Sequence, residues 1–451
     1  MNLKAAIIGN ILFPIGDFVT RSEVSRQLKL HRSYSKLGSD ELHEIQKAKL
    51  SRLLNHATST CDFYYKCHRF VNTDFPYESI QKFPVISKQI VSSNQEKFLS
   101  KLYQKKHLIK YETSGSSGIR SEVFFDKKEQ SVCRAILINW WEWGGFFLGK
   151  PLLQTGMTPT RGFIKRIKDI VLSTHYIDAF KLKEEELLNH LRRVEGKQGY
   201  MLAGYASSLF VLAQVAEEHA LNVSFDSAIS FGDKLFSHYK EKIESVFRCS
   251  LYENYGLNEG FMIGQKKDLP YYYIYTPSVY LEILDENNNP VPDGSIGRII
   301  ATKLDGYAMP LIRYDTGDLG IMLPLSEYPR VRDMAFPLLK MVVGRNTDIV
   351  RTSDGNNLIV HTFTGIFEFF PEIQQFQIVQ DRLDSVTIRI VISPRFKDDI
   401  LQQIERMIKN KTNSSIEISW EYVSGIPASK SGKPQIIVNN LVNHSLADII
   451  D

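Results

Sequence analysis

The sequence predicts an α/β protein with a large N-terminal part and a separate, small α+β part at the C-terminus. Helical periodicity dominates residues 127–250, strand patterns follow from residue 250 onward, and short strands and helices alternate beyond residue 344. A chain of 451 residues has room for about two to four domains of ordinary size. With 43% hydrophobic and 24% charged residues, the composition excludes wholesale disorder.

The N-terminal half contains the clearest helical patterns. Within residues 40–57 the apolar side chains fall near one helical face, at Leu42, Ile45, Leu50, Leu53 and Leu54. Residues 184–196 and 207–221 show the same periodicity. A short β-branched and aromatic run at residues 122–126 follows a Gly/Ser cluster and predicts a strand.

The C-terminal half is richer in strand patterns. Residues 273–284 and 296–304 flank the turn sequence of residues 285–294, which predicts a hairpin or meander. Beyond residue 344 the pattern is β-α-β-α-β, in this order: IVRTSDGNNLIV, a helix at 362–370, a strand at 385–392, a helix at 396–411 and a strand at 416–423. This succession predicts a compact α+β domain of about a hundred residues.

Charge and cysteine content exclude several classes of protein. The 55 Lys and Arg against 51 Asp and Glu give a net charge of only +4, so no basic face for nucleic acid is expected. Four Cys without a CxxC pair are no disulfide framework and indicate a reducing compartment. The longest apolar stretch, residues 5–16, is too short to span a membrane and lacks a signal-peptide cleavage site. We therefore expect a cytoplasmic protein in which residues 5–16 form a helix that packs on its own domain, or that contacts a membrane or a partner peripherally.

The segment YETSGSSGIRSEVFFD (residues 111–126) is the first candidate for chemistry. Ser, Thr and Gly fill residues 113–118 directly before a predicted strand. Glycines allow a close approach of the backbone, and hydroxyl and amide groups can cradle phosphate oxygens. The sequence GxxxxGK[ST] is absent, so this is no Walker loop, and taken alone the segment could equally be a flexible loop.

Four further segments follow this loop in a particular order. They are ENYGLNEG at 253–260, MPLIRYDTGD at 309–318, VVGRNTDIV at 342–350 and IPASKSGKPQ at 426–435. Together with the loop, they resemble the adenylate-forming superfamily of acyl-CoA synthetases, adenylation domains and luciferases. Within it, the chain is most similar to phenylacetate–CoA ligases and to the CapK-type proteins of capsular polysaccharide loci. The resemblance implies an adenylation domain at residues 1–343, with βαβ sheets, helices and a β-rich subdomain, and a small mobile lid domain at residues 344–451.

The resemblance implies a role for each residue that matches a family motif. Thr113 and the residues after it would hold the β- and γ-phosphates of ATP and let the loop close over them; these are Ser114, Gly115, Ser116, Ser117 and Gly118. Gly232 and Asp233 would line the adenine and acyl pocket. Tyr255 would stack on the adenine, with Asn254 and Gly256 beside it in the same motif.

Further matches imply the catalytic groups. Glu259 would ligate Mg²⁺, and Asp318 would accept hydrogen bonds from the ribose with the help of Arg345. Lys433 would reach the carboxylate and the α-phosphate, so that Lys433, Glu259 and Thr113 are the residues expected to take part in catalysis. Arg313 would act near the phosphates or in a conformational role, or it forms a structural ion pair.

The implied reaction is the activation of a small carboxylic acid with Mg·ATP to an acyl-adenylate, followed by transfer to an acceptor, in the first place coenzyme A. One alternative is a CapK-like ligase that forms an amide or ester in capsular or surface polysaccharide biosynthesis, without coenzyme A. Another is a nucleotide-binding protein without catalytic activity. The aromatic run NWWEWGGFF at residues 139–147 would line an acyl pocket or would belong to the core.

Overall fold

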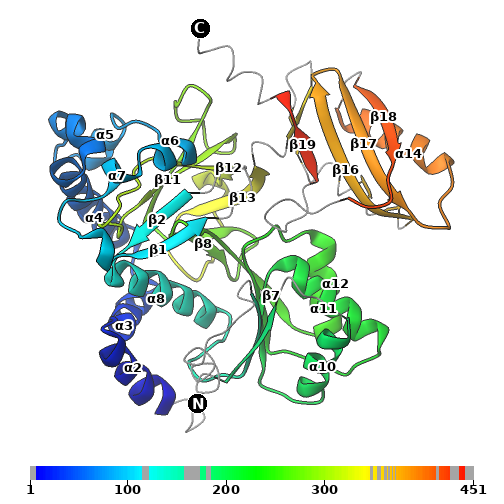
Figure 1. Ribbon diagram of the computed structural model, residues 1–451, viewed down its shortest axis with the longest axis horizontal. Helices are drawn as coiled ribbons and strands as arrows, with labels where there is room; N and C mark the ends of the chain where they lie inside the picture. The colour runs from blue at the N-terminus through cyan, green and yellow to red at the C-terminus, as the bar shows by residue number, and fades with distance from the viewer. Residues whose placement is uncertain are drawn as a thin grey trace.

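The computed structural model describes residues 7–113, 121–156, 173–178, 184–345, 349–352, 357–359, 372–412, 416–426 and 436–441, together with Phe363, Ile366, Phe367, Phe369 and Phe370. The fold is α/β, as the sequence predicts (Figure 1). Within the described ranges, we find no helix with the length and apolar composition of a membrane-spanning segment.

One mixed sheet of eleven strands organises the larger part of the chain. In spatial order its strands are β10 (Val279–Leu284), β11 (Ile296–Lys303), β12 (Tyr314–Met322), β13 (Leu338–Arg345), β9 (Tyr272–Ile274), β8 (Phe261–Lys266), β7 (Ser250–Leu257), β6 (Ser227–Ser230), β5 (Met201–Gly204), β3 (Leu152–Gly156) and β4 (Thr174–Asp178). Neighbours from β10 to β7 pair antiparallel, and neighbours from β7 to β4 pair parallel. Strand β7 is therefore the boundary between two kinds of sheet.

The parallel half is built from short buried strands and amphipathic helices. Helices α10 (Glu184–Val194), α11 (Ala206–Glu218) and α12 (Ser237–Phe247) bury their apolar faces in one cluster with this sheet. The helical pattern of the sequence predicts α10 and α11 correctly. It misses β5 and β6, because runs of four buried residues between helices carry no periodic signal.

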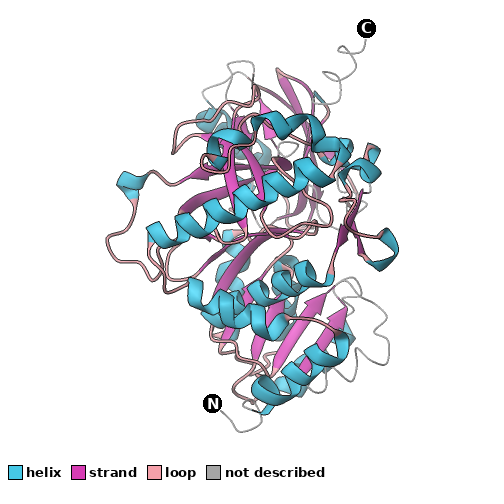
Figure 2. Ribbon diagram, turned by 90° about the vertical axis from the view of Figure 1, so that its left-hand side faces the viewer, coloured by secondary structure: helices cyan, strands magenta, loops and turns pink. Residues whose placement is uncertain are grey.

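The antiparallel half is covered by the helices of the N-terminal part, which lie across it in Figure 2. The long helices here are α3 (Val24–Tyr34), α4 (Ser39–Thr60) and α8 (Lys127–Trp143). Shorter elements are η1 (Ile8–Leu12), α2 (Phe13–Thr20), η2 (Asp62–Phe70), α5 (Pro76–Ile80), α6 (Lys88–Ser93), α7 (Gln95–Phe98), η3 (Lys105–His107), η4 (Leu325–Glu327) and the hairpin of β1 (Ile109–Thr113) and β2 (Ser121–Phe125). The expected helix at 40–57 is thus the centre of α4.

A second, four-stranded sheet lies apart from the first, at the right of Figure 1. Its order is β18 (Glu417–Tyr422), β17 (Ser385–Ile392), β16 (Ile373–Arg382) and β19 (Ile437–Asn439), and helix α14 (Asp399–Thr412) packs against it. A small hairpin of β14 (Ile349–Arg351) and β15 (Asn357–Ile359) precedes it. The predicted α+β character of this part is confirmed, and the boundary predicted at residue 344 falls near the end of β13.

Two expectations about aromatic segments have clear outcomes. The strand expected over 273–284 is divided into β9 and β10 around Pro277. Trp140 and Trp141 lie on α8 and are 1% and 7% exposed. Their burial favours the core over an acyl pocket as the place of the aromatic run at residues 139–147. Trp141 also stacks on Phe231, with ring centroids 6.3 Å apart, so the core continues directly to the loop after β6.

The buried His31 makes the stability of the fold sensitive to acid. Its side chain is 1% exposed, and Nδ1 lies 2.7 Å from the hydroxyl of Tyr275. Burial lowers the pKa of His31 from 6.5 to about 3, so the ring is neutral in the folded chain. Below pH 6.5 the His31 ring binds a proton in the unfolded chain but stays neutral in the folded chain. The free energy of unfolding therefore falls by up to about 1.4 kcal/mol for each pH unit.

We expect His31→Gln to remove this contribution. Between pH 6.5 and 5 the variant should lose about 2 kcal/mol less unfolding free energy than the unmodified chain does. Urea titrations at both pH values measure the difference. Parallel pH profiles for the two proteins would contradict a neutral, buried His31.

Candidate active site

Tyr255 and Asp318 meet where the two halves of the large sheet join. Tyr255 on β7 is 9% exposed, and its hydroxyl donates to Oδ2 of Asp318 on β12 at 2.9 Å. Burial, with a smaller contribution from the Asp318 carboxylate, raises the pKa of Tyr255 well above its ordinary value. The phenol therefore remains a hydrogen-bond donor that holds the carboxylate in place. The two residues were predicted separately, 63 positions apart, and the structure brings them into contact.

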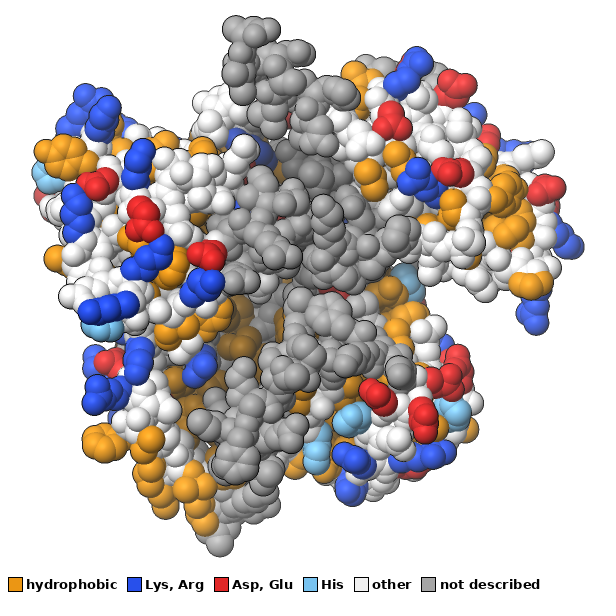
Figure 3. Space-filling model, viewed as in Figure 1, with side chains coloured by type: hydrophobic (Ala, Val, Ile, Leu, Met, Phe, Trp, Pro, Cys, Tyr) orange, Lys and Arg blue, Asp and Glu red, His pale blue; other side chains and the backbone are white. Residues whose placement is uncertain are grey.

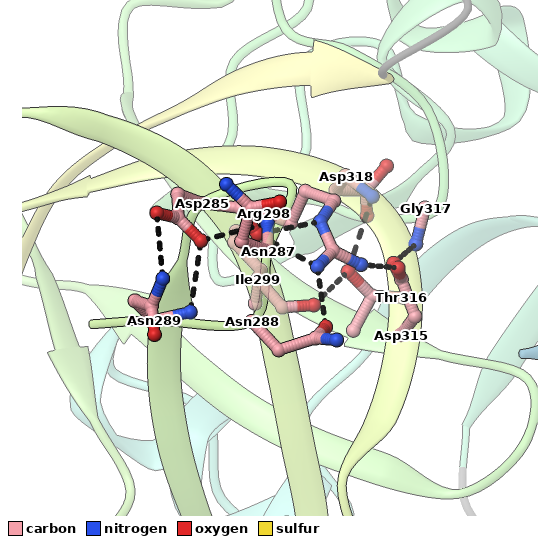
Figure 4. A network of polar contacts seen from close by, with 10 residues as sticks. All are labelled: Asp285, Asn287, Asn288, Asn289, Arg298, Ile299, Asp315, Thr316, Gly317 and Asp318. Atoms are coloured by element: carbon pink, nitrogen blue, oxygen red, sulfur yellow. Dashed lines mark hydrogen bonds and ion pairs between the residues drawn. The ribbon is translucent and has the colours of Figure 1, made fainter. Parts of the chain in front are cut away.

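A network of polar contacts holds residues 315–318, a turn within the irregular part of β12 that carries Asp318 (Figure 4). The Asp318 amide donates to Oγ1 of Thr316, and this hydroxyl donates to the Ile299 carbonyl of β11 at 2.9 Å. Asp315 accepts the Gly317 amide at 2.9 Å and pairs with Arg298 at 2.6 Å, with both side chains mostly buried. Bonds of this kind to charged groups are stronger than neutral ones, so the turn is rigid.

Arg298 connects this turn to the next one along the sheet. Its Nη2 donates to the Asp285 carbonyl and to Oδ1 of Asn288, both at 2.7 Å. The Asp285 carboxylate in turn accepts the amides of Asn287 and Asn289 at 2.8 Å, which is the Asx geometry that the DENNN sequence favours. Sequence reasoning predicts the turn but not its support of Asp318.

Asp318 also lies opposite Arg345, the other residue expected to contact the ribose. The two are cross-strand partners in the antiparallel register of β12 and β13. Directly opposite residues have Cβ atoms about 5 Å apart. The side chain of Arg345 lies outside the described part, so the register is the observation that joins them.

Glu259 occupies the turn between β7 and β8. Its side chain is 7% exposed, and Oε1 accepts a hydrogen bond from the hydroxyl of Tyr314 at 3.2 Å. Gly260 follows with φ of +86°, and a Cβ there would lie 2.5 Å from the ring of Phe125, so glycine is required by both conformation and space. A register shift between Tyr255 and Gly256 precedes the turn. This irregularity lies within the predicted ENYGLNEG motif. Bulges of this kind change the direction in which side chains point and are frequent next to active sites.

A buried ion pair contacts the turn between β7 and β8 that carries Glu259. Nζ of Lys303 donates to the Glu259 carbonyl at 3.0 Å and lies 2.5 Å from Oε1 of Glu129. The side chains of Lys303 and Glu129 are only 2% and 1% exposed, and Nζ lies 4.4 Å from the centroid of the Phe125 ring. Burial raises the pKa of Glu129 to about 7, although Lys303 acts to lower it. Sequence reasoning misses this pair, and the one available signal is a lysine at the end of an apolar strand, which needs a partner when buried.

The loop after β6 carries Gly232 and Asp233. The Asp233 carboxylate accepts hydrogen bonds from the amides of Ala206 and Ser207, at 2.5 and 3.1 Å, at the N-terminus of α11. Gly232 has φ of +81°, and a Cβ there would lie 2.5 Å from the Tyr205 ring. These contacts tie the loop to a helix terminus, and the expected place of Asp233 at the adenine and acyl pocket stays a prediction.

The same loop reaches the C-terminal part of the chain. Nζ of Lys234 donates to the Val343 carbonyl at 2.7 Å, one residue before the predicted domain boundary. Phe236 is 7% exposed and belongs to the hydrophobic cluster of the small sheet, with Val350 and Leu358. Residues 231–236 therefore contact both parts.

Asn254 precedes Tyr255 on β7 and stands out by its unused amide. Both side-chain atoms, Oδ1 and Nδ2, are shielded from solvent without a hydrogen-bond partner among the described residues. Unpaired buried amides are costly, and this one lies directly beside Tyr255 in the predicted motif.

Arg313 forms a structural ion pair, which is one of the roles expected for it. Its Nε and Nη2 donate to the two carboxylate oxygens of Glu282 at 3.1 and 3.0 Å, and its Nη1 donates to the carbonyls of Gln81 and Phe83. The residue is 5% exposed with φ of 52°. It thereby fastens the segment before α6 to β10 and β12, away from solvent.

Several predicted residues fall outside the described part. Thr113 ends β1 and pairs with Ser121 at the start of β2, so the two residues that flank segment 114–120 lie side by side. The side chain of Thr113, all of residues 114–120 and Lys433 lie outside the described residues.

Comparison with known proteins agrees with the expected resemblance. Residues 350–440 match the family model of the CapK C-terminal domain. The chain is 22% identical to protein CapK of Staphylococcus aureus over 422 residues, which cover 89% of this chain and 90% of CapK. It is 32% identical to the phenylacetate-coenzyme A ligase of Aromatoleum evansii over 151 residues, 31% of this chain and 32% of that ligase.

Solved structures extend the similarity to the whole fold. A crystal structure of 2-hydroxyisobutyryl-CoA ligase in the postadenylation state matches with a TM-score of 0.71 and 16% identity, over 92% of this chain and 93% of that one. The same ligase in the thioesterification state gives a TM-score of 0.58 and 16% identity, over 92% and 94%. The resemblance read from the motifs is thus confirmed: the chain is similar to CapK over most of its length, and its fold is that of 2-hydroxyisobutyryl-CoA ligase.

Proposed function

We propose that this protein is an AMP-forming ligase that activates a carboxylic acid with Mg·ATP and passes the acyl group to an acceptor. The observation that carries the proposal is the convergence of Tyr255, Asp318 and Glu259 at the β7–β8 hairpin and the neighbouring β12 turn. An aromatic face, a ribose-binding carboxylate and a metal-binding carboxylate are the groups that Mg·ATP needs. The unpaired amide of Asn254 beside Tyr255 supports a ligand at this position.

The residues present fit a magnesium ion. Among the described residues no group of three His, Cys, Asp or Glu is arranged to hold a metal. Mg²⁺ commonly uses one or two carboxylates and completes its shell with phosphate oxygens and water. Glu259 supplies such a carboxylate and is oriented by Tyr314. A bound Mg²⁺ would neutralise phosphate charge during the reaction.

The chemistry is an in-line displacement at the α-phosphate. The substrate carboxylate forms a bond to phosphorus, the bond to the bridging oxygen breaks, and pyrophosphate leaves. Asp318 accepts hydrogen bonds from the ribose hydroxyls, and Tyr255 packs against the adenine. Together these contacts hold the α-phosphate in position for the attacking carboxylate oxygen. Lys433 and the loop from Thr113 to Gly118 stabilise the charge on the phosphate oxygens.

The acyl-adenylate then needs a second nucleophile. We propose that residues 344–451 form a mobile lid domain, and that its rotation withdraws Lys433 and admits the acceptor. The higher TM-score to the postadenylation state than to the thioesterification state supports an arrangement that belongs to one stage of such a cycle. The thiol of coenzyme A is the first acceptor to test.

A second candidate keeps the adenylation step and replaces coenzyme A by an amine or hydroxyl. The similarity to CapK over 89% of the chain favours it, since phenylacetate-coenzyme A ligase matches over only 31%. The two candidates differ in the acceptor alone, so the first half-reaction tests both.

Acid-dependent release of pyrophosphate is the decisive measurement. Purified protein is incubated with Mg·ATP and a panel of aryl acetates, short fatty acids, amino acids and sugar uronates. We expect release with one class of acid, and a decrease of about 100-fold or more in Lys433→Ala, because a cation at the α-phosphate is lost. Lys430→Ala is the matched control, three residues away, and should retain activity.

The outcomes separate the candidate functions. Release that is equal in Lys433→Ala and Lys430→Ala would refute the assignment of Lys433. ATP binding without release for any acid would favour the non-catalytic nucleotide-binding protein. Once an acid is found, coenzyme A and amines are compared as acceptors by their consumption of the adenylate.

A further inference from the structure

The N-terminal helix has an apolar face that nothing in the described structure covers. Its exposed apolar residues are Ile7 (41%), Ile11 (52%), Leu12 (43%), Ile15 (54%), Phe18 (86%) and Val19 (73%). Helix α2 itself buries none of its residues. Apolar side chains gather at the lower edge of the molecule in Figure 3, where Figure 1 places α2. Exposed apolar side chains that gather on one helix are a feature of interaction sites.

The helix is nevertheless fixed to the body of the protein. Ile8 is 3% exposed and belongs to a cluster with Val24 and Leu28 of α3, against which Phe13 also packs. The Asp17 carboxylate accepts hydrogen bonds from Oγ of Ser22 and the amide of Ser25, both at 2.6 Å. The exposed face is therefore presented by a held helix.

Charge identifies what the face fits. Asp17 is the single charged residue between Ile7 and Thr20, and its carboxylate is engaged with the segment before α3. Positive charge adjoins the end of the helix. Arg21 caps it and is exposed, and Nζ of the exposed Lys127 donates to the Thr20 carbonyl at 3.1 Å.

We propose that residues 7–20 dock this protein on an anionic lipid bilayer, with Phe18 and Val19 inserted between the head groups. Arg21 and Lys127 then meet lipid phosphates. An apolar helix face bordered by cations is the pattern of helices that lie in the membrane interface. A second copy of the chain is a poorer fit, because a two-fold contact of this face would bring the same cations together.

The docked orientation leaves the C-terminal part of the chain away from the membrane. In Figure 1, α2 lies at the lower left, and the small C-terminal sheet lies at the upper right. Contact with a membrane at α2 therefore does not block the C-terminal part. The proposal rests on this surface and is independent of the ligase activity.

Sedimentation with vesicles tests the proposal on the full chain. Phosphatidylcholine vesicles with 30% phosphatidylglycerol, about a third anionic lipid, are compared with phosphatidylcholine alone. We expect binding to the anionic vesicles that weakens with salt, and a loss of affinity of about 10-fold or more in Phe18→Ser/Val19→Ser. Arg21→Gln/Lys127→Gln should bind more weakly and show a smaller salt dependence.

The matched control is Tyr65→Ser/Leu102→Ser, in which two side chains of similar exposure, 73% and 72%, are changed outside α2. This variant should bind vesicles as the unmodified chain does. Equal binding by Phe18→Ser/Val19→Ser, or no binding to anionic vesicles, would overturn the proposal. A dimer in light scattering that Phe18→Ser/Val19→Ser abolishes, without vesicle binding, would assign the face to a second copy instead.

Discussion

Glu259→Gln is expected to reduce acid-dependent pyrophosphate release by about 10²–10³-fold at saturating ATP. The substitution keeps the size of the side chain and its acceptor for Tyr314, and it removes the negative charge that would bind Mg²⁺. Initial rates are measured over a range of Mg²⁺ concentrations. The variant should also need more Mg²⁺ for half of its remaining activity, which a general loss of structure would not cause.

Tyr314→Phe is the companion variant. It leaves the carboxylate and removes the hydroxyl that donates to Oε1. We expect a decrease of about 10-fold or less, since one neutral hydrogen bond contributes about 1 kcal/mol. If Glu259→Gln retains activity within a factor of three, Glu259 is no metal ligand, whatever Tyr314→Phe does.

Lys303→Met is expected to destabilise the fold by about 3–5 kcal/mol. It leaves the buried Glu129 side chain, which is 1% exposed, without its partner, and breaking a buried ion pair from one side is strongly unfavourable. The midpoint and slope of guanidinium unfolding measure the change. The same variant removes the donor to the Glu259 carbonyl, so the remaining folded protein should also need more Mg²⁺ for half of its activity.

The double variant Lys303→Met/Glu129→Leu distinguishes the charge from the packing. Removal of both charges should restore most of the lost stability, because replacing a buried pair by apolar residues is often neutral. The supporting contact to Glu259 stays absent in the double variant. Equal destabilisation in the single and double variants would show that the cost comes from volume and not from an unpaired charge.

The sequence predicted those features whose signal is local. Helices α4, α10 and α11 have amphipathic periods, and β11 and β17 have strand patterns bounded by turns, so their existence follows from short segments. The short strands β5 and β6 are defined by their neighbours in the parallel sheet and carry no signal of their own. The Pro277 segment divides an apolar run that looked continuous.

The residues of the candidate site also divide into those that a local motif predicts and those that only the fold brings together. Motifs predicted Tyr255, Glu259 and Asp318, but the hydrogen bond between Tyr255 and Asp318 joins β7 and β12, which three other strands separate in the sheet, so only the three-dimensional fold shows it. Lys303 and Glu129 were missed because each looks like an ordinary charged residue until the fold buries both. Arg313 lies within a family motif, and its four side-chain hydrogen bonds show that a motif residue can serve the scaffold.

The loop of residues 231–236 has a thermodynamic consequence. One end is tied to α11 through Asp233, its middle to β13 through Lys234, and Phe236 is buried in the cluster of the small sheet. A rotation of the C-terminal part must therefore change the surroundings of a loop that was expected to border the substrate. Coupling of this kind is reciprocal: a ligand that favours one orientation by a given factor is itself bound more tightly in that orientation by the same factor. If residues 344–451 rotate as proposed, the affinity for the acid and the orientation of this part depend on the same equilibrium.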